Sequence, residues 1–181
     1  MALLTKAQAL GASPTARSMQ LAQSDLRKAA STPRDTRFDI FLSHSSEDAR
    51  VIVGVRAMLE KEGMKVYVDW LEDPELDRSR VNTTTAATLR ARMNHCGYLL
   101  YASSHSSSNS KWMPWELGYF DGRRPGHVGI LPIVAAPGES FVGVEYLGLY
   151  PVVERVNFQS GTVFGHFTGP RVADPLRTMV R

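Results

Sequence analysis

The sequence contains a single cysteine, Cys96, among its 181 residues. One cysteine cannot form a disulfide within the chain, and it cannot supply the ligands of a cysteine zinc site. Disulfides are rare in reducing compartments, so the composition fits a protein of the cytoplasm. We therefore expect a cytoplasmic chain whose core forms without covalent cross-links.

Long hydrophobic runs are also missing. No stretch reaches the roughly 20 apolar residues of a membrane-spanning helix, and no apolar segment of signal-peptide length follows a basic start. The content of 43% hydrophobic and 22% charged residues is ordinary for a globular protein. We expect no membrane partner, and a length sufficient for one domain with a core plus an additional segment.

Positive charge is scarce where a nucleic-acid interface would need it. Residues 1–37 hold six Lys/Arg and two Asp/Glu, whereas residues 38–181 hold fifteen and sixteen. The net charge of +3 therefore comes from the N-terminal segment, and the remainder is close to neutral. Nucleic-acid binding proteins concentrate basic residues on one face, so we expect no nucleic-acid partner.

Motifs for metals and phosphates are absent too. The sequence has no glycine-rich phosphate-binding signature. His44 and His105 lack a clear third ligand for zinc, and the spacing of Ser and His residues does not match the nucleophile elbow of hydrolases. We therefore expect neither a metal ion nor a bound cofactor.

Short apolar runs alternate with segments of helical periodicity from Phe38 onward. Helices are predicted after Ser45, over 83–94 and over 109–122. Pro151 places the last predicted strand at an edge, because proline cannot donate to a sheet. This alternation predicts an α/β fold with a five-stranded parallel sheet and helices on both faces. The predicted strands are 38–43, 65–70, 98–103, 128–134 and 150–156.

The first 36 residues have a different composition, rich in Ala, Gln, Ser and Arg. Apolar positions within 15–30 have helical spacing, which indicates an amphipathic helix. A flexible extension, a self-association or regulatory helix and an organelle transit peptide all fit this segment. We expect residues 1–36 to form a partly helical or flexible extension, and residues 37–181 to form the folded domain.

Polar residues gather at one edge of the predicted sheet. Ligands of parallel α/β sheets bind at the carboxyl ends of the strands, and this edge carries 43–46, 69–70, 103–105 and the start of the helix in "NSKWMPWELGYFDG" (109–122). Trp112 and Glu116 share a face of that helix. Position alone leaves two readings open for each: Glu116 caps the helix or meets a substrate, and Trp112 is a core or a site residue.

Three motifs together resemble a known family. "FDIFLSHSSED" at the first strand, "VYVDW" followed by a polar loop, and "S-x-W-x-x-W-E-L" after the third strand are similar to Toll/interleukin-1 receptor (TIR) domains. The resemblance covers residues 38–160 and is greatest to the bacterial branch, which includes the TIR effectors of Thoeris-type antiphage defence. It implies a flavodoxin-like five-stranded parallel sheet.

The resemblance also implies an activity, the cleavage of the nicotinamide–ribose bond of NAD+, with NAD+ as substrate and no separate cofactor. It matches Glu116 to the catalytic glutamate of the family and Trp112 to its helix tryptophan. The product would be ADP-ribose or a cyclic isomer, as an antiphage immune signal read by a downstream effector. The residues expected to bind substrate are Trp112, Ser43, His44, Ser45, Asp69, Trp70 and Ser103.

The loop of residues 70–82 resembles the family's BB loop, which shapes the site and mediates assembly. Arg78 and Arg80 follow acidic residues in this loop, so we expect exposed charges that support head-to-tail self-association. The "SHSSED" segment has no arginine, and this leaves the pyrophosphate of NAD+ without a predicted basic partner. Two alternatives stay open: a non-enzymatic module that only binds other TIR domains, and a nucleoside deoxyribosyltransferase-like enzyme.

Overall fold

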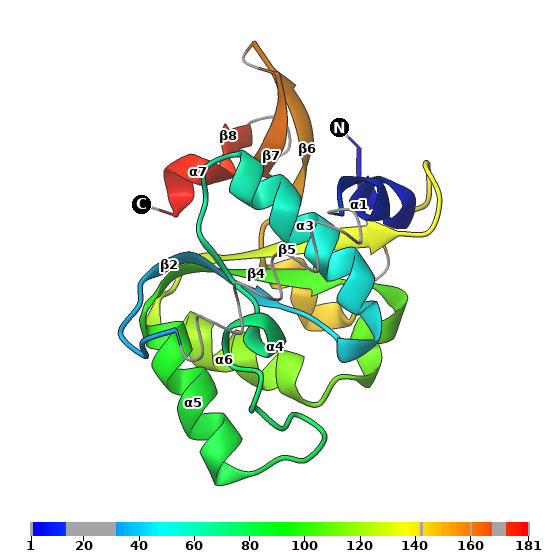
Figure 1. The fold of residues 1–181 in the computed structure, drawn as a ribbon. Helices are drawn as coiled ribbons and strands as arrows, with labels where there is room; N and C mark the ends of the chain where they lie inside the picture. Colours follow the sequence, from blue (N-terminus) through cyan, green and yellow to red (C-terminus); the bar gives the residue numbers. More distant parts are fainter. Residues whose placement is uncertain (1, 14–31, 142, 160, 168–172, 181) are drawn as a thin grey trace.

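A parallel sheet of five strands lies at the centre of the molecule (Figure 1). The computed structural model describes residues 2–13, 32–141, 143–159, 161–167 and 173–180. The strands stand in the order β1-β5-β4-β2-β3, and every neighbouring pair is parallel. The predicted α/β fold with a five-stranded parallel sheet is therefore confirmed. The strands are β1 (Leu4–Thr5), β2 (Phe38–Ser43), β3 (Val66–Tyr67), β4 (Cys96–Ser103) and β5 (Val128–Val134).

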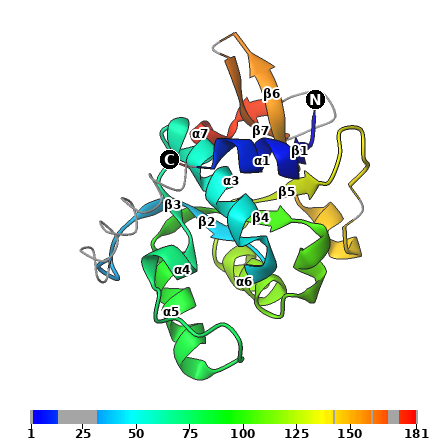
Figure 2. The same ribbon diagram turned by 45° about the vertical axis from the view of Figure 1, so that its right-hand side comes forward.

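Helices cover both faces of this sheet, so two hydrophobic clusters form, one on each side (Figure 2). The helices α1 (Lys6–Ala12) and α3 (Ala49–Lys61) lie on one face. The helices α5 (Thr83–Asn94) and α6 (Trp112–Arg123) lie on the other. The predicted helix over 83–94 is confirmed, and the predicted helix over 109–122 begins at Trp112. The short segments are η1 (Ser46–Asp48), α4 (Asp69–Glu72), η2 (His105–Asn109) and η3 (Glu145–Leu149).

The helix boundaries follow local chemistry. At the start of α5, the Oδ1 of Asn82 accepts a hydrogen bond from the backbone N–H of Thr85 at 2.8 Å, which is the usual N-cap arrangement. After α3, Gly63 has φ of +83°, a left-handed conformation that glycine adopts without a steric penalty. These caps fix the lengths of the two helices that flank the ligand edge.

The fifth strand of the sheet differs from the prediction. The predicted edge strand 150–156 pairs with β5 through a bridge between Ile130 and Val152, and the chain then leaves the parallel sheet. The edge position is taken by β1, which pairs with Ile133 and Val134. A strand of two residues has too little periodicity to be recognised in the sequence, and this is why it was missed.

The described N-terminal residues 2–13 form β1 and α1 and are packed against the domain, within the segment expected to be a partly helical or flexible extension. Leu4 and Ala9 are fully buried. A Cβ atom on Gly54 of α3 would lie 1.8 Å from the carbonyl oxygen of Ala9, so α1 crosses α3 at a contact that only glycine permits. The helix predicted over 15–30 lies outside the described residues.

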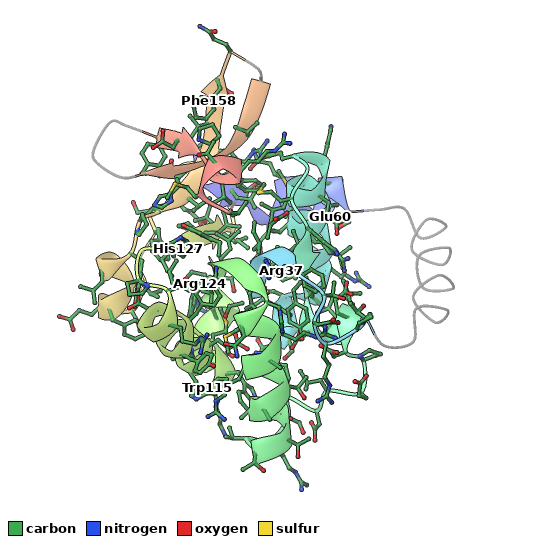
Figure 3. All side chains as sticks on the ribbon, turned by 90° about the vertical axis from the view of Figure 1, so that its left-hand side faces the viewer. Arg37, Glu60, Trp115, Arg124, His127 and Phe158 are labelled. Carbon is green, nitrogen blue, oxygen red and sulfur yellow. The ribbon has the colours of Figure 1, made fainter. Side chains whose placement is uncertain are left out.

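A small antiparallel sheet follows the parallel one and projects from it (Figure 1). It consists of β6 (Val153–Phe158), β7 (Gly161–Phe167) and β8 (Ala173–Pro175), followed by α7 (Leu176–Met179). Phe158 lies near the end of the projecting hairpin (Figure 3). Val153, Phe164 and Leu176 anchor this unit, because they are buried in the cluster beneath α3.

No helix in the described ranges is both long and apolar enough to cross a membrane.

Replacing Leu4 with alanine should lower the free energy of unfolding by about 2–5 kcal/mol, because a buried leucine would leave a cavity beside β5. Chemical denaturation measures this change. Leu10 lies in the adjoining helix α1 and is 45% exposed, so Leu10→Ala is the matched control and should cost less than about 0.5 kcal/mol. Equal costs for the two variants would show that β1 does not belong to the folded sheet.

His166 should make stability depend on pH. Burial lowers the pKa of His166, an effect that nearby Asp174 only partly opposes. The unfolded chain therefore binds a proton more readily, so the free energy of unfolding should fall as the pH drops below about 6.5. Denaturation at pH 7.5 and pH 5.5 should show a larger loss for the wild type than for His166→Gln. Identical losses would contradict this role of His166.

Candidate functional site

Glu116 lies in the second turn of α6 and is fully buried at the carboxyl ends of the strands. Ser43 at the end of β2 donates a hydrogen bond from its Oγ to Oε2 of Glu116 at 2.6 Å. The residue before α6 is Lys111, whose side chain makes no capping hydrogen bond, and the first turn of α6 contains no acidic residue. Glu116 therefore does not cap its own helix; its carboxylate is turned toward the edge of the sheet.

Arg78 is the second partner of this carboxylate. Its Nη2 donates to Oε1 of Glu116 at 2.8 Å, and its Nη1 donates to Oδ2 of Asp69. Burial lowers the pKa of Arg78, but the charges of Glu116 and Asp69 outweigh burial and raise it. One guanidinium thus bridges two carboxylates that come from α6 and from the start of α4.

This position corrects the expectation for Arg78. The sequence predicts an exposed loop charge available for contacts between subunits, but the Arg78 side chain is only 17% exposed and belongs to the site. Arg80, two residues further, is exposed as expected. The signal that could have identified Arg78 was its position as the first cation after a run of acidic residues in a loop beside the ligand edge.

His44 and Asp69 form the other end of the same network. The Nδ1 of His44 is 2.8 Å from the carbonyl oxygen of Leu42, so Nδ1 carries a proton and donates. The Nε2 of His44 lies 3.2 Å from the indole Nε1 of Trp70 and 3.3 Å from Oδ1 of Asp69. Burial raises the pKa of Asp69, but the electrostatic influence of the neighbouring His44 and Arg78 outweighs burial and lowers it.

Trp112 holds the loop in place. Its indole Nε1 donates to the backbone carbonyl oxygen of Arg78 at 3.1 Å, and its ring is 5% exposed. Trp115 meets Trp112 edge to face and lies beside α5 (Figure 3). Trp112 therefore packs in the hydrophobic cluster on the face covered by α5 and α6, and it also holds the loop that carries Arg78.

The structure does not bring all the predicted residues together. Ser45 accepts a hydrogen bond from the backbone N–H of Glu47 at 3.4 Å and lines the pocket next to His44. Ser103 is buried but lines a different pocket, beyond Tyr101. Ser103 thus lies outside the network of Glu116, Arg78 and Asp69, and its substrate-binding role stays a prediction.

A small polar pocket opens beside this network. Its volume is about 180 Å³, and Arg78, His44 and Trp112 form part of its wall. Pockets that enclose small molecules usually measure about 300–1,000 Å³. Lys111 contributes a second cation to the pocket wall, one that was not predicted from the sequence. In this conformation the pocket is too small for a dinucleotide, and Glu116 is not part of its lining.

The base of the loop is fixed by a buried arginine of α5. Arg92 is 1% exposed and forms two hydrogen bonds with the carboxylate of Asp73, at 2.6 and 2.8 Å. Its remaining donors reach the carbonyl oxygens of Thr32 and Pro33, both at 2.7 Å. The loop is therefore anchored at Asp73 on one side and at the N-cap Asn82 on the other.

The described part of the chain contains no group of three or more His, Cys, Asp or Glu residues placed to hold a metal ion. Every buried side-chain nitrogen and oxygen in the described ranges has a hydrogen-bond partner. The site gathers one imidazole, two carboxylates and one guanidinium, and the guanidinium of Arg78 contacts both carboxylates in this conformation.

Two curated proteins are similar to this chain in sequence. The chain is 53% identical over 119 residues to "Probable 3' cyclic ADP-D-ribose synthase ThsB'" of Bacillus cereus (strain MSX-D12), which covers 65% of this chain and 61% of that protein. It is 30% identical over 83 residues to "Putative cyclic ADP-D-ribose synthase TIR2" of Cytobacillus dafuensis, which covers 45% and 22%. The chain thus spans less than two thirds of the length of either relative.

Among solved structures, the TIR domain of the Toll-related receptor TRR-2 from Hydra magnipapillata is 18% identical, with a TM-score of 0.44 over 61% of this chain and 78% of that one. This likeness is too distant to carry an argument. The family model described as "TIR domain" matches residues 40–159, which is most of the described domain. This chain belongs to the TIR domain family.

Proposed function

We propose that this chain cleaves the nicotinamide–ribose bond of NAD+ and releases nicotinamide together with a cyclic ADP-ribose isomer or ADP-ribose. The observation that carries the proposal is the Glu116 carboxylate, buried at the ligand edge of the sheet and held by Ser43 and Arg78. The names of the two relatives, a "Probable 3' cyclic ADP-D-ribose synthase" and a "Putative cyclic ADP-D-ribose synthase", support the same reaction.

A single carboxylate suffices for the cleavage step. The nicotinamide ring carries a positive charge before the bond breaks and leaves as a neutral molecule, so no acid has to protonate it. Positive charge develops instead on the ribose, as in glycoside hydrolysis. A carboxylate held against that carbon stabilises the transition state more than the ground state, and this difference lowers the barrier.

Substrate binding requires a change at Arg78. The guanidinium occupies Oε1 of Glu116, and its positive charge would oppose the charge that develops on the ribose. Displacement of Arg78 would uncover Glu116 and enlarge the adjoining pocket. Arg78 and Lys111 both line that pocket, so the pyrophosphate of NAD+ would meet two cations there. This supplies the basic partners that the first loop lacks.

The remaining roles extend the same proposal. Ser43, His44, Ser45, Asp69, Trp70 and Trp112 would form the walls of the opened site. Self-association through the 70–82 loop, where Trp70 is 36% and Val81 67% exposed, would favour the open conformation. The product would serve in the cytoplasm as an antiphage immune signal for a downstream effector, with no cofactor beyond NAD+ itself.

One alternative has an observation in its favour. A TIR module that only binds other TIR domains needs no accessible carboxylate, and Glu116 is fully buried beneath Arg78. Nicotinamide release by the purified protein, assayed over a range of protein concentrations, distinguishes the two functions. The deoxyribosyltransferase-like alternative gains no support from the family match.

Glu116→Gln should lower kcat for nicotinamide release by at least about 10²-fold, the usual effect of removing one electrostatic stabiliser. Gln keeps the shape and can still accept from Ser43, so thermal melting should change far less than activity. Asp121 lies on the same helix and is only partly buried, so Asp121→Asn is the matched control with normal turnover. Near-full turnover by Glu116→Gln would remove the basis of the proposed function.

Arg78→Gln should lower the free energy of unfolding by about 3–5 kcal/mol, because it leaves two buried carboxylates without their shared cation. Arg80→Gln changes an exposed arginine of the same loop and should cost less than about 0.5 kcal/mol. Denaturant unfolding compares the two variants. If both have wild-type stability, Arg78 is an exposed loop charge in solution, as the sequence alone suggested.

A further inference from the structure

The cleavage chemistry leaves one requirement without a residue. A cyclic product closed through a ribose hydroxyl, like the 3' product in the name of the Bacillus cereus relative, forms when that hydroxyl attacks the ribosyl carbon of the same substrate molecule and loses its proton. The proton acceptor has to be a second group, because Glu116 stabilises the positive charge at the carbon under attack. This inference rests on the proposed function and concerns the step after nicotinamide has left.

We propose that His44 is the general base of this second step and that Asp69 is its positioning residue. His44 lies at the carboxyl end of β2, next to Ser43, which binds Glu116. It also lines the pocket beside Arg78, Lys111 and Trp112. The His44 side chain is only 2% exposed, so its imidazole lies in the wall of the space that the second part of a dinucleotide would occupy once the site opens.

The hydrogen bonds of His44 determine which ring nitrogen can accept a proton. A carbonyl oxygen can only accept, so the contact of 2.8 Å with Leu42 keeps the proton on Nδ1. The lone pair of the neutral imidazole then resides on Nε2, where it accepts the indole N–H of Trp70 at 3.2 Å. Trp70 is 36% exposed, so a substrate hydroxyl can take its place as the donor to Nε2.

Asp69 can stabilise the positive charge that forms on the imidazole of His44. Its Oδ1 lies 3.3 Å from Nε2 of His44, so the protonated ring can donate to this carboxylate. In the described conformation Arg78 neutralises Asp69 through Oδ2. When Arg78 moves away to admit the substrate, it uncovers Glu116 and also gives His44 an uncompensated carboxylate. One displacement thus prepares the cleavage step and the ring-closing step together.

The bonds and protons balance. The carbon–nitrogen bond breaks with its electron pair moving to the nicotinamide ring, which becomes neutral. The hydroxyl oxygen then bonds to the ribosyl carbon while its proton passes to Nε2 of His44. The imidazolium formed opposite Asp69 returns its proton to solvent. No oxidant, reductant or further reactant takes part.

The decisive measurement is the ratio of cyclic to linear product from NAD+, determined by mass spectrometry between pH 5.5 and 8 with the full chain. Histidine side chains change charge between about pH 5 and 8. The wild-type ratio should therefore fall on acidification, because a protonated His44 cannot accept the hydroxyl proton. A ratio cancels effects on the shared cleavage step. Several other charged groups lie in the ion-pair network or the pocket that contains His44. They are Asp69, Arg78, Glu47, Lys111 and Glu116.

His44→Gln should lower the cyclic-to-linear ratio by at least about 10²-fold, the lower range for a general base, and make it independent of pH. Nicotinamide release should fall much less than the ratio. Asp69→Asn should keep a pH-dependent ratio but move its midpoint to lower pH, because the imidazolium loses its carboxylate. The control is His127→Gln, at an exposed histidine that precedes β5 at the end opposite the site; its profile should match the wild type.

The outcomes separate the two proposals. If the wild type releases no nicotinamide under any condition, the proposed function fails. If it releases nicotinamide but forms only linear product, or if His44→Gln keeps the wild-type ratio and pH profile, the function stands and the role of His44 is overturned. If His44→Gln is unstable, the Asp69→Asn midpoint decides, and an unchanged midpoint contradicts the proposal.

Discussion

The ion-pair bridge of Arg78 between Asp69 and Glu116 is the interaction on which the site depends. It joins a loop to the carboxyl edge of the sheet, and it compensates two buried carboxylates that would otherwise repel each other. Burying either carboxylate alone would cost several kcal/mol, about the size of a domain's whole stability margin. The bridge therefore keeps the site folded and closed at the same time, and a substrate must replace its charge when it enters.

The rest of the architecture holds this bridge in position. Trp112 binds the backbone of Arg78, and Arg92 fixes Asp73 at the base of the loop. Both arginines are therefore held by several hydrogen bonds. Arg92 positions the loop, and Arg78 occupies the site. Because Arg92 also binds the carbonyl oxygens of Thr32 and Pro33, the chain that leads into β2 is joined to the loop through a single buried side chain.

The sequence was sufficient where a pattern is repeated over several residues. The runs that became β2, β4 and β5 are apolar and almost fully buried, and the helical periods became α3 and α5. The sequence was insufficient at β1, because a strand of two residues shows no periodic pattern of apolar residues. It was also insufficient at 150–156, where the pairing partner of the strand differs from the prediction. There the apolar run predicted a strand correctly, but its partner is β7 of the small sheet. Pairing depends on which surfaces are free after folding, and no local pattern encodes it.

The same division applies to the site. The sequence by itself determined the α/β class, the edge at which the polar residues meet, and Glu116 with Trp112 on one face of a helix, because periodicity and strand ends are local properties. Only the tertiary structure decided that Glu116 is paired and not a cap, that Ser103 lies in another pocket, and that Arg78 reaches Asp69 and Glu116. These are contacts between residues 9 and 38 positions apart. Such contacts arise from the path of a loop over the sheet. The local sequence does not distinguish a long charged side chain that points into solvent from one that reaches a buried site.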